Sequence, residues 1–207
     1  MIIPVRLSMI ALVAALAALS GCETPGRLSR RVEGQWSGVP MNFDKKTMID
    51  GEFTPTFRFE RIDGVRNGGN FTMTAMVNVT MPVDAPIDSL GTTPVSASAS
   101  GLATVSGTWV ADDTDDLDLI YDLTTLVVNM DPDVQFEYAN IWTSGDLPAS
   151  SKVPVAVRRA FEKQMTDGLT ASIDEIDDLD DISFNKDETM MNCKLDDRKQ
   201  TLTRIYE

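Results

Sequence analysis

The sequence predicts a mainly β protein, either an antiparallel β-barrel or a β-sandwich, with one amphipathic α-helix. Three observations support this class. Apolar and polar residues alternate along most of the chain, as the strands of a half-buried sheet require. Clusters of Gly, Asp and Asn separate these segments and supply turns. Helical spacing of apolar residues is clear in one segment only, near 151–167.

The clearest strands lie between residues 53 and 81. Phe53, Phe57 and Phe59 alternate with polar residues, and Asp63-Gly64 then provides a turn. From Phe71 to Met81, the odd-numbered positions form an apolar face. This pattern predicts two long neighbouring strands.

The middle of the chain supplies further strand candidates. We expect a loop at 82–94, which contains Pro82, Pro86 and Pro94. Small apolar residues then alternate with Ser and Thr over 95–105, and Leu and Tyr alternate with Asp over 117–123. Weaker patterns predict separate strands at 126–130 and 134–142.

The helix and three closing strands complete the expected domain, which spans 32–207. Ser150 or Ser151 is a suitable N-terminal cap for the helix, and Gly168 a suitable end. We expect strands at 182–184, 190–195 and 200–206.

The N-terminal residues 1–21 have the pattern of a cleaved signal peptide. One basic residue, Arg6, precedes an apolar run at 7–19 that is too short to span a membrane. The run ends in Leu19-Ser20-Gly21-Cys22, which resembles the lipobox of bacterial lipoproteins. This resemblance implies that Cys22 carries a diacylglycerol after cleavage and that residues 22–31 form a lipidated tether.

Acyl chains on Cys22 predict a permanent association with a membrane of the cell envelope, because each buried methylene contributes about 0.8 kcal/mol. Glu23 does not decide between the two membranes; we expect the outer one. The net charge of −14 argues against a nucleic-acid partner, since an acidic surface repels phosphates.

The chain has no histidine, which excludes Ser-His-Asp triads, Cys-His pairs and HExxH zinc sites. We therefore expect no enzyme and no cofactor; the alternative is a hydrolase that uses two carboxylates or Ser151-Lys152. The acidic runs 112–118 and 174–181 are interpreted as solvated segments rather than metal sites, with calcium binding as the alternative. Cys193 is interpreted as a buried free thiol.

Two short motifs resemble the lipocalin and wider calycin pattern. Gly34-Gln35-Trp36 lies on the first expected strand of the domain, and Arg204 on the last. With Gly107-Thr108-Trp109 in the middle, the chain is similar to Bacteroidetes-type lipocalin-like lipoproteins. The resemblance implies that Gly34, Trp36 and Arg204 form the floor of a barrel, with the guanidinium over the indole.

If such a barrel is hollow, it binds a small apolar or amphipathic ligand at the cell envelope. The alternative is a filled barrel that acts as an interaction module, accessory to another envelope protein or a polysaccharide-handling complex. The inward-facing apolar residues are the candidates for lining the cavity: Phe57, Phe59, Phe71, Met73, Val77 and Tyr121.

Overall fold

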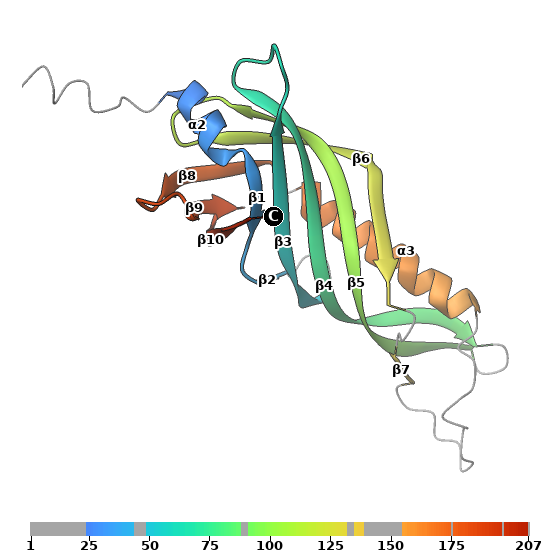
Figure 1. Cartoon of the computed structure of the whole chain (residues 1–207). Helices are drawn as coiled ribbons and strands as arrows, with labels where there is room; N and C mark the ends of the chain where they lie inside the picture. Colours follow the sequence, from blue (N-terminus) through green and yellow to red (C-terminus); the bar gives the residue numbers. More distant parts are fainter. Residues whose placement is uncertain are drawn as a thin grey trace, which may run out of the picture.

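The computed structural model describes residues 24–43, 49–87, 91–131, 135–138, 155–174, 176–195 and 197–206. The predicted Leu19-Ser20-Gly21-Cys22 motif and Ser151-Lys152 lie outside these residues. A ten-stranded antiparallel sheet dominates the fold, and two described helices lie against it (Figure 1). The mainly β prediction is therefore confirmed.

The sheet nearly closes in a ring. Its hydrogen-bonded order is β1-β10-β9-β8-β6-β5-β4-β3, and β3 pairs back to β1, while β2 adds to β3 and β7 to β5. The strands are β1 (Gly34–Ser37), β2 (Met41–Asn42), β3 (Asp50–Arg61), β4 (Gly68–Ile87), β5 (Gly91–Ala111), β6 (Leu117–Met130), β7 (Gln135–Tyr138), β8 (Asp178–Phe184), β9 (Met190–Leu195) and β10 (Arg198–Ile205).

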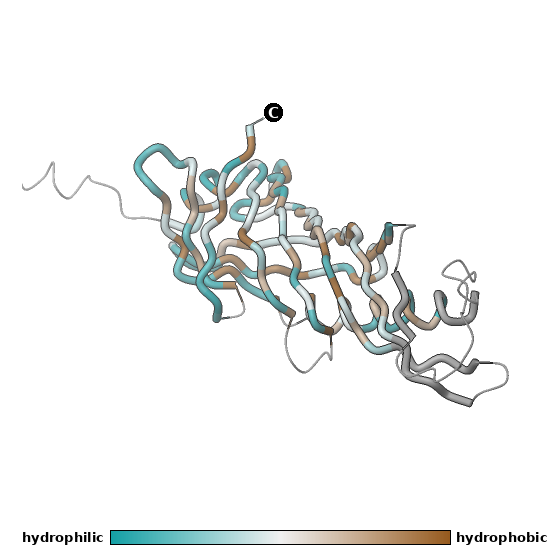
Figure 2. The backbone as a smooth tube through the Cα atoms, turned by 90° about the horizontal axis from the view of Figure 1, so that it is seen from below, coloured by the Kyte–Doolittle hydropathy of each residue, from teal (hydrophilic) through white to brown (hydrophobic). Residues whose placement is uncertain are grey.

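Alternation places the core inside this ring. The odd-numbered apolar residues of β3 and β4 are buried, from Phe53 on the first strand to Met81 on the second. Apolar and polar segments accordingly alternate along the strands in Figure 2. Each fully buried Phe contributes on the order of 2–3 kcal/mol through removal of its surface from water. Met76 is on the outer face, as its position in the pattern predicts.

The prediction of a loop at 82–94 is wrong for the residues that the structure describes, 82–87 and 91–94. β4 continues to Ile87 and β5 starts at Gly91, with pairing maintained throughout. β3 starts only at Asp50, which pairs with Thr80, so β4 has no β3 neighbour beyond that point. Within the described part of the chain, no strand pairs with β4 on that side beyond Thr80, and an edge without a strand neighbour tolerates proline because the missing N–H is not needed there.

Helix α3 (Val155–Asp174) extends further than the predicted 151–167. It buries Phe161, Met165 and Leu169 against the inner side of the long strands, behind them in Figure 1. Gly168 lies inside the helix rather than at its end. A Cβ at Gly168 would come within 2.3 Å of Ile49 Cδ1, so the glycine permits close packing of helix and sheet.

The expected tether at 22–31 also differs in the structure. Residues 25–32 form helix α2 (Pro25–Val32), whose side chains Leu28 and Val32 are buried against the ring. The Thr24 hydroxyl caps the helix by accepting a hydrogen bond from Arg27 N at 3.2 Å. The packed fold therefore begins at about Pro25 rather than at residue 32. Within the described residues, neither helix has the length and apolar character needed to cross a bilayer.

Candidate ligand groove between β6 and α3

One end of the ring is closed by Trp36, Arg204 and helix α2. Trp36 and Arg204 are paired residues on β1 and β10, and the guanidinium carbon lies 4.3 Å from the centroid of the indole ring. Gly34 has a φ of 120°, a conformation that favours glycine. The predicted stacking of Arg204 on Trp36 is confirmed.

Arg204 also fixes α2 to the ring. Its Nη2 donates to Arg31 O at 2.5 Å, its Nη1 to Glu33 O at 3.1 Å and its Nε to Glu188 O at 3.1 Å. The Trp36 indole N–H donates to Val32 O at 2.7 Å. The bonds to Arg31 O, Val32 O and Glu33 O satisfy backbone carbonyls at the C-terminal end of α2, which lack partners within the helix. The role of this end is structural.

The predicted cavity residues are packed against one another. Phe57 stacks on Phe59 at 5.7 Å between ring centroids, and Phe59 contacts Phe71 at 6.2 Å. Tyr121 meets the edge of Phe71 at 5.0 Å, and its hydroxyl reaches the sulfur of Met73 at 3.8 Å. Five of the six candidates are at most 2% exposed, and Tyr121 is half-buried: Phe57, Phe59, Phe71, Met73, Val77 and Tyr121. These side chains therefore act as core at this level of the ring.

The ring is least complete at β6. The strand pairs with β8 only at Leu117↔Leu179 and Asp118↔Asp178. On its other side, the register with β5 shifts from Ser106↔Asp122 to Thr104↔Val127, so extra residues form a bulge. β6 turns sharply in Figure 1 and leaves β8. The predicted strands at 117–123 and 126–130 are thus one strand with an internal bulge.

Local hydrogen bonds hold the bulge. The Thr125 hydroxyl donates to Asp122 O at 2.7 Å and accepts from Ser106 N at 2.9 Å. The Asp122 carboxylate accepts from the Thr124 hydroxyl at 2.6 Å and from Thr124 N at 3.1 Å. Bulges of this kind bend a strand and disrupt regular pairing at its free edge. The bulge therefore directs the second half of β6 along α3.

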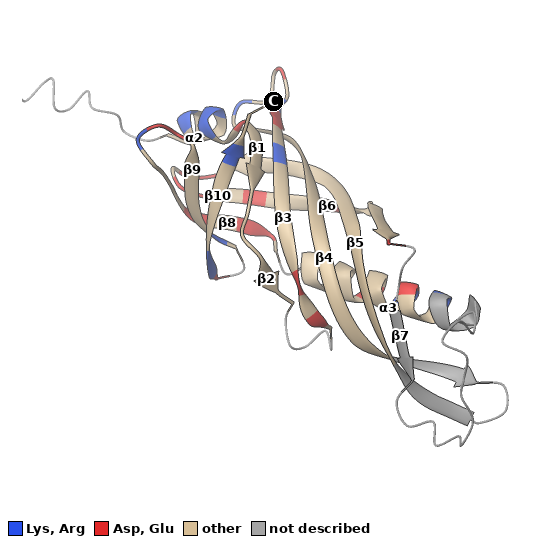
Figure 3. Ribbon diagram, turned by 60° about the horizontal axis from the view of Figure 1, so that its bottom comes forward, with Lys and Arg blue, Asp and Glu red and all other residues tan. Residues whose placement is uncertain are grey.

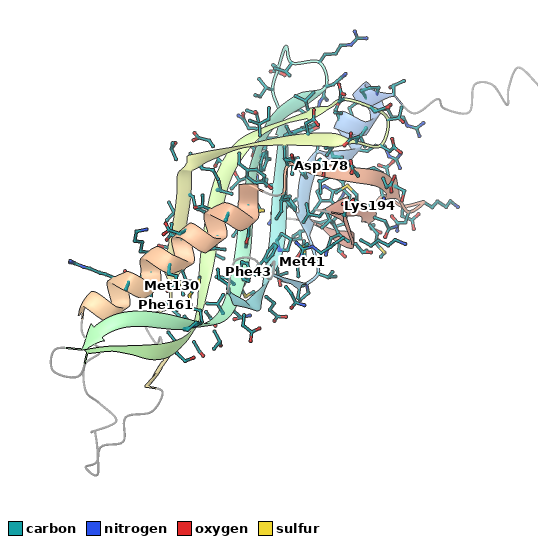
Figure 4. All side chains as sticks on the ribbon, turned by 180° about the vertical axis from the view of Figure 1, so that it is seen from behind. Met41, Phe43, Met130, Phe161, Asp178 and Lys194 are labelled. Carbon is teal, nitrogen blue, oxygen red and sulfur yellow. The ribbon has the colours of Figure 1, made fainter. Side chains whose placement is uncertain are left out.

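An apolar row follows the inner side of β6 at this open part of the ring. Its side chains pack against the core but are only partly buried: Tyr121, Leu123, Leu126, Val128 and Met130. Figure 4 places Met130 and Phe161 near the N-terminal half of α3. Apart from Tyr121, which the sequence analysis named as a cavity candidate, the sequence analysis missed this row. Its signal was present, because the apolar positions change from odd to even numbers between Leu123 and Leu126.

A groove of about 560 Å³ separates the end of β6 from α3. Residues 128–130 form one wall, and the other carries Arg159, Glu162, Lys163 and Asp167. Lys163 forms an ion pair with Asp167 one helical turn away. The volume is typical of sites that hold small ligands. The groove places two apolar side chains, Val128 and Met130, opposite a wall of charged and polar side chains on α3.

A second cluster consists of carboxylates where β6 meets β8. Burial, a hydrogen bond with Asp180 and the negative charges of Asp180, Asp118 and Asp178 raise the pKa of Asp116 to about 6. Such a pair is a requirement of the hydrolase alternative, but the groove described above does not include it. No group of three or more potential ligands among the described residues could hold a metal ion.

Cys193 is a free, buried thiol on β9, as predicted. Burial raises its pKa to about 12, so the reactive thiolate is scarce at neutral pH. The expected buried side of the second acidic run is also found, with Ile173, Ile176 and Leu179 in the core.

The fold and the groove define a mainly β protein whose ring of strands is incomplete beside a helix. Comparison with known proteins adds no relative to this description: no protein-family model, no curated protein and no solved structure matches the chain. The lipocalin-like resemblance therefore stays a prediction from the short motifs around Trp36 and Arg204.

Proposed function

We propose that this protein is a non-enzymatic lipoprotein of the bacterial cell envelope that binds the acyl part of an amphipathic molecule in the groove between β6 and α3. The observation that carries the proposal is the end of the apolar row of β6, where the half-buried side chains of Val128 and Met130 line this groove. Full burial of such side chains by a ligand removes more apolar surface from water.

The composition and the N-terminal motif support the other parts of the proposal. The absence of histidine removes the most common catalytic arrangements. The Leu19-Ser20-Gly21-Cys22 motif supports lipid attachment at Cys22 and so a place on a membrane. The choice of the outer membrane is part of the proposal, because Glu23 does not decide it. The packed interior around Phe59 moves the expected ligand from the centre of the ring to its open side.

The bulge in β6 favours a small ligand over strand addition by another protein. A peptide that extends a sheet needs a regular edge with available backbone groups. The local hydrogen bonds of Asp122 and Thr125 interrupt that regularity.

The proposal is tested with a fluorescent lysophosphatidylcholine and the chain from residue 22 carrying Cys22→Ser, which retains every described element. Val128→Asp introduces a charge into the groove, and we expect at least a tenfold loss of affinity, equal to about 1.4 kcal/mol. Val127→Asp is the matched control, because Val127 is 52% exposed on the opposite face of the same strand. Fluorescence titration of the three proteins measures the dissociation constants.

Absence of binding by the parent chain would overturn the proposal, as would equal affinities for the two variants. Circular dichroism checks that both variants remain folded.

A second candidate function is docking of an envelope protein on the outer face of β4–β6. Met76 is 59% exposed and pairs with Leu102, which is 44% exposed and lies diagonal to Val127. Such an apolar patch on a sheet face is typical of an interaction surface. Here Val127→Asp, and not Val128→Asp, would abolish recovery of a partner crosslinked in intact cells.

A further inference from the structure

The outer side of the closed end carries the basic side chains of α2. Arg27 and Arg30 are three residues apart and exposed on one face of the helix, whereas Leu28 and Val32 are buried against the ring. Figure 3 shows the basic residues of α2 in blue. Residues 25–32 include no acidic side chain, although the net charge of the whole chain is −14. The exposed face of α2 is therefore a local exception to the charge of the molecule.

The turn between β3 and β4 combines two further arginines with exposed apolar side chains. Arg61 and Arg66 flank the turn, and between them Ile62 and Val65 are 38% and 43% exposed. Val65 N donates to Ile62 O at 3.1 Å, which closes the turn. Apolar side chains at the tip of a hairpin can enter the boundary between headgroups and acyl chains, while neighbouring guanidinium groups stay among the lipid phosphates.

The turn lies beside the N-terminal end of α2. A Cβ on Gly26 would come within 3.3 Å of Asn67 Oδ1, and Asn67 O accepts from Ala111 N at 2.7 Å. Figures 1 and 3 both place α2 and the turn at the same end of the ring, away from the N-terminal half of α3. We call the exposed side chains of these two elements the arginine surface: Arg27, Arg30, Arg61, Ile62, Val65 and Arg66.

Carboxylates adjoin the arginine surface, so its long-range attraction for anions is weak. Asp63 lies within the turn, and Glu188 forms an ion pair with Arg31 at 2.8 Å. Exposed carboxylates also lie on the neighbouring segments: Glu33, Glu60, Asp112 and Asp113. Contact with a membrane must then depend on short-range interactions, namely direct bonds from guanidinium groups to phosphate oxygens and burial of the two apolar side chains.

The chain that precedes the described residues supplies the proximity that such weak contacts need. Cys22 is three residues before Pro25, the first residue of α2, and three residues span at most about 11 Å. A lipid on Cys22 therefore holds the start of α2, and the turn beside Gly26, close to the headgroups. A short tether of this kind gives a high effective concentration, so individually weak contacts are sufficient for docking.

We propose that the arginine surface docks on the phospholipid bilayer that holds the lipid of Cys22, with Ile62 and Val65 in the interface. The arginines bind lipid phosphates, for which the planar guanidinium group is well shaped. The groove between β6 and α3 then lies at the end of the molecule that points away from this bilayer (Figure 1). The inference rests on the proposed function for the lipid on Cys22, but not for a ligand in the groove.

Chemical attachment of a lipid tests the surface without relying on lipidation in the cell. In the chain from residue 22, the Cys22 thiol is coupled to a maleimide phospholipid in vesicles of phosphatidylethanolamine and phosphatidylglycerol. Cys193 is buried and its pKa is raised to about 12, so coupling favours Cys22. Brominated acyl chains in these vesicles quench the fluorescence of a tryptophan that enters the bilayer.

Val65→Trp and Val39→Trp form a matched pair, because the two valines are 43% and 45% exposed. Val39 follows the end of β1 that is further from α2, so it should stay in water. We expect brominated lipid to remove roughly half of the emission that Val65→Trp adds to the parent chain, and none of that added by Val39→Trp. Equal quenching of the two variants, or no quenching of Val65→Trp, would overturn the proposal.

A second pair tests the contribution of the arginines. In the chain with Val65→Trp, Arg30→Gln should weaken docking about fivefold, because it removes one cation at the lipid surface. Lys199→Gln removes an exposed cation at the opposite end of β10 from Arg204, and should leave the quenching unchanged. Equal quenching with and without Arg30→Gln would also overturn the proposal.

The result can be told apart from failure of the proposed function. A chain that docks when coupled, but carries no lipid when it is isolated from cells, would retain the arginine surface and overturn the lipoprotein part of that function. A chain that docks but binds no lysophosphatidylcholine would retain the surface and overturn the function of the groove.

Discussion

The two ends of the ring differ in how completely their strands are joined. At one end, Arg204 joins α2, β1 and the segment before β9 through three hydrogen bonds and a stacked indole. At the other, β6 leaves its neighbour and presents half-buried apolar side chains to α3. The difference shows that one continuous sheet can have an end closed by hydrogen bonds and a side where apolar side chains stay half-buried.

The largest expected effect is at the closed end. Trp36 is fully buried, so Trp36→Ala should lower the free energy of unfolding by about 3–5 kcal/mol. Urea denaturation followed by circular dichroism measures the change. Tyr206→Ala, at a position 68% exposed beside the same sheet, is the control and should stay within about 0.5 kcal/mol of the parent. A loss below about 1 kcal/mol for Trp36→Ala would contradict a structural role.

A smaller effect separates the charge of Arg204 from its geometry. Arg204→Lys retains the cation but loses the planar fork that reaches three carbonyls, and we expect a loss of about 1–3 kcal/mol. Arg66→Lys, in an exposed turn, should have little effect on the same urea curves. If Arg204→Lys were as stable as the parent chain, the positive charge alone would be sufficient to stabilise the closed end.

The smallest effect is expected at the open side. Thr125→Val removes the hydroxyl that bonds Ser106 N and Asp122 O, and should cost about 1 kcal/mol. Exchange of the Ser106 amide should accelerate. The contribution of Trp36 to the free energy of unfolding should stay unchanged. Thr72→Val, on the outer face of β4, provides the comparison. Equal effects of the two substitutions would mean that the bulge needs no local support.

Local patterns were sufficient to predict most strands. The alternation around Phe57 and Phe71 is strong because one face of each strand is in the core. Helix α2 also had a local signal, since Thr24 and Pro25 suit the cap and the first turn of a helix. It was interpreted as a tether because the segment is short and polar.

The remaining errors depend on contacts distant in sequence. Whether Pro82 ends a strand depends on where β3 begins, and that is set by the Asp50↔Thr80 pair. Whether Gly168 ends a helix depends on Ile49, which packs against it. The groove also depends on contacts distant in sequence. In β6 the apolar positions change from odd to even numbers, which predicts a bulge, but only the fold brings α3 opposite Val128.

The pairing of β1 with β10 has a consequence for how the chain reaches its native state. Gln35 is hydrogen-bonded in register with Ile205, so the first and last strands meet across nearly the whole sequence. Hairpins between consecutive strands, such as β4 and β5, need only short segments and can assemble early, whereas joining the termini carries a large loop entropy. Closure of the ring must therefore wait until the final residues have been synthesised, and a chain that stops before β10 lacks the strand that pairs with β1 on the side opposite β3.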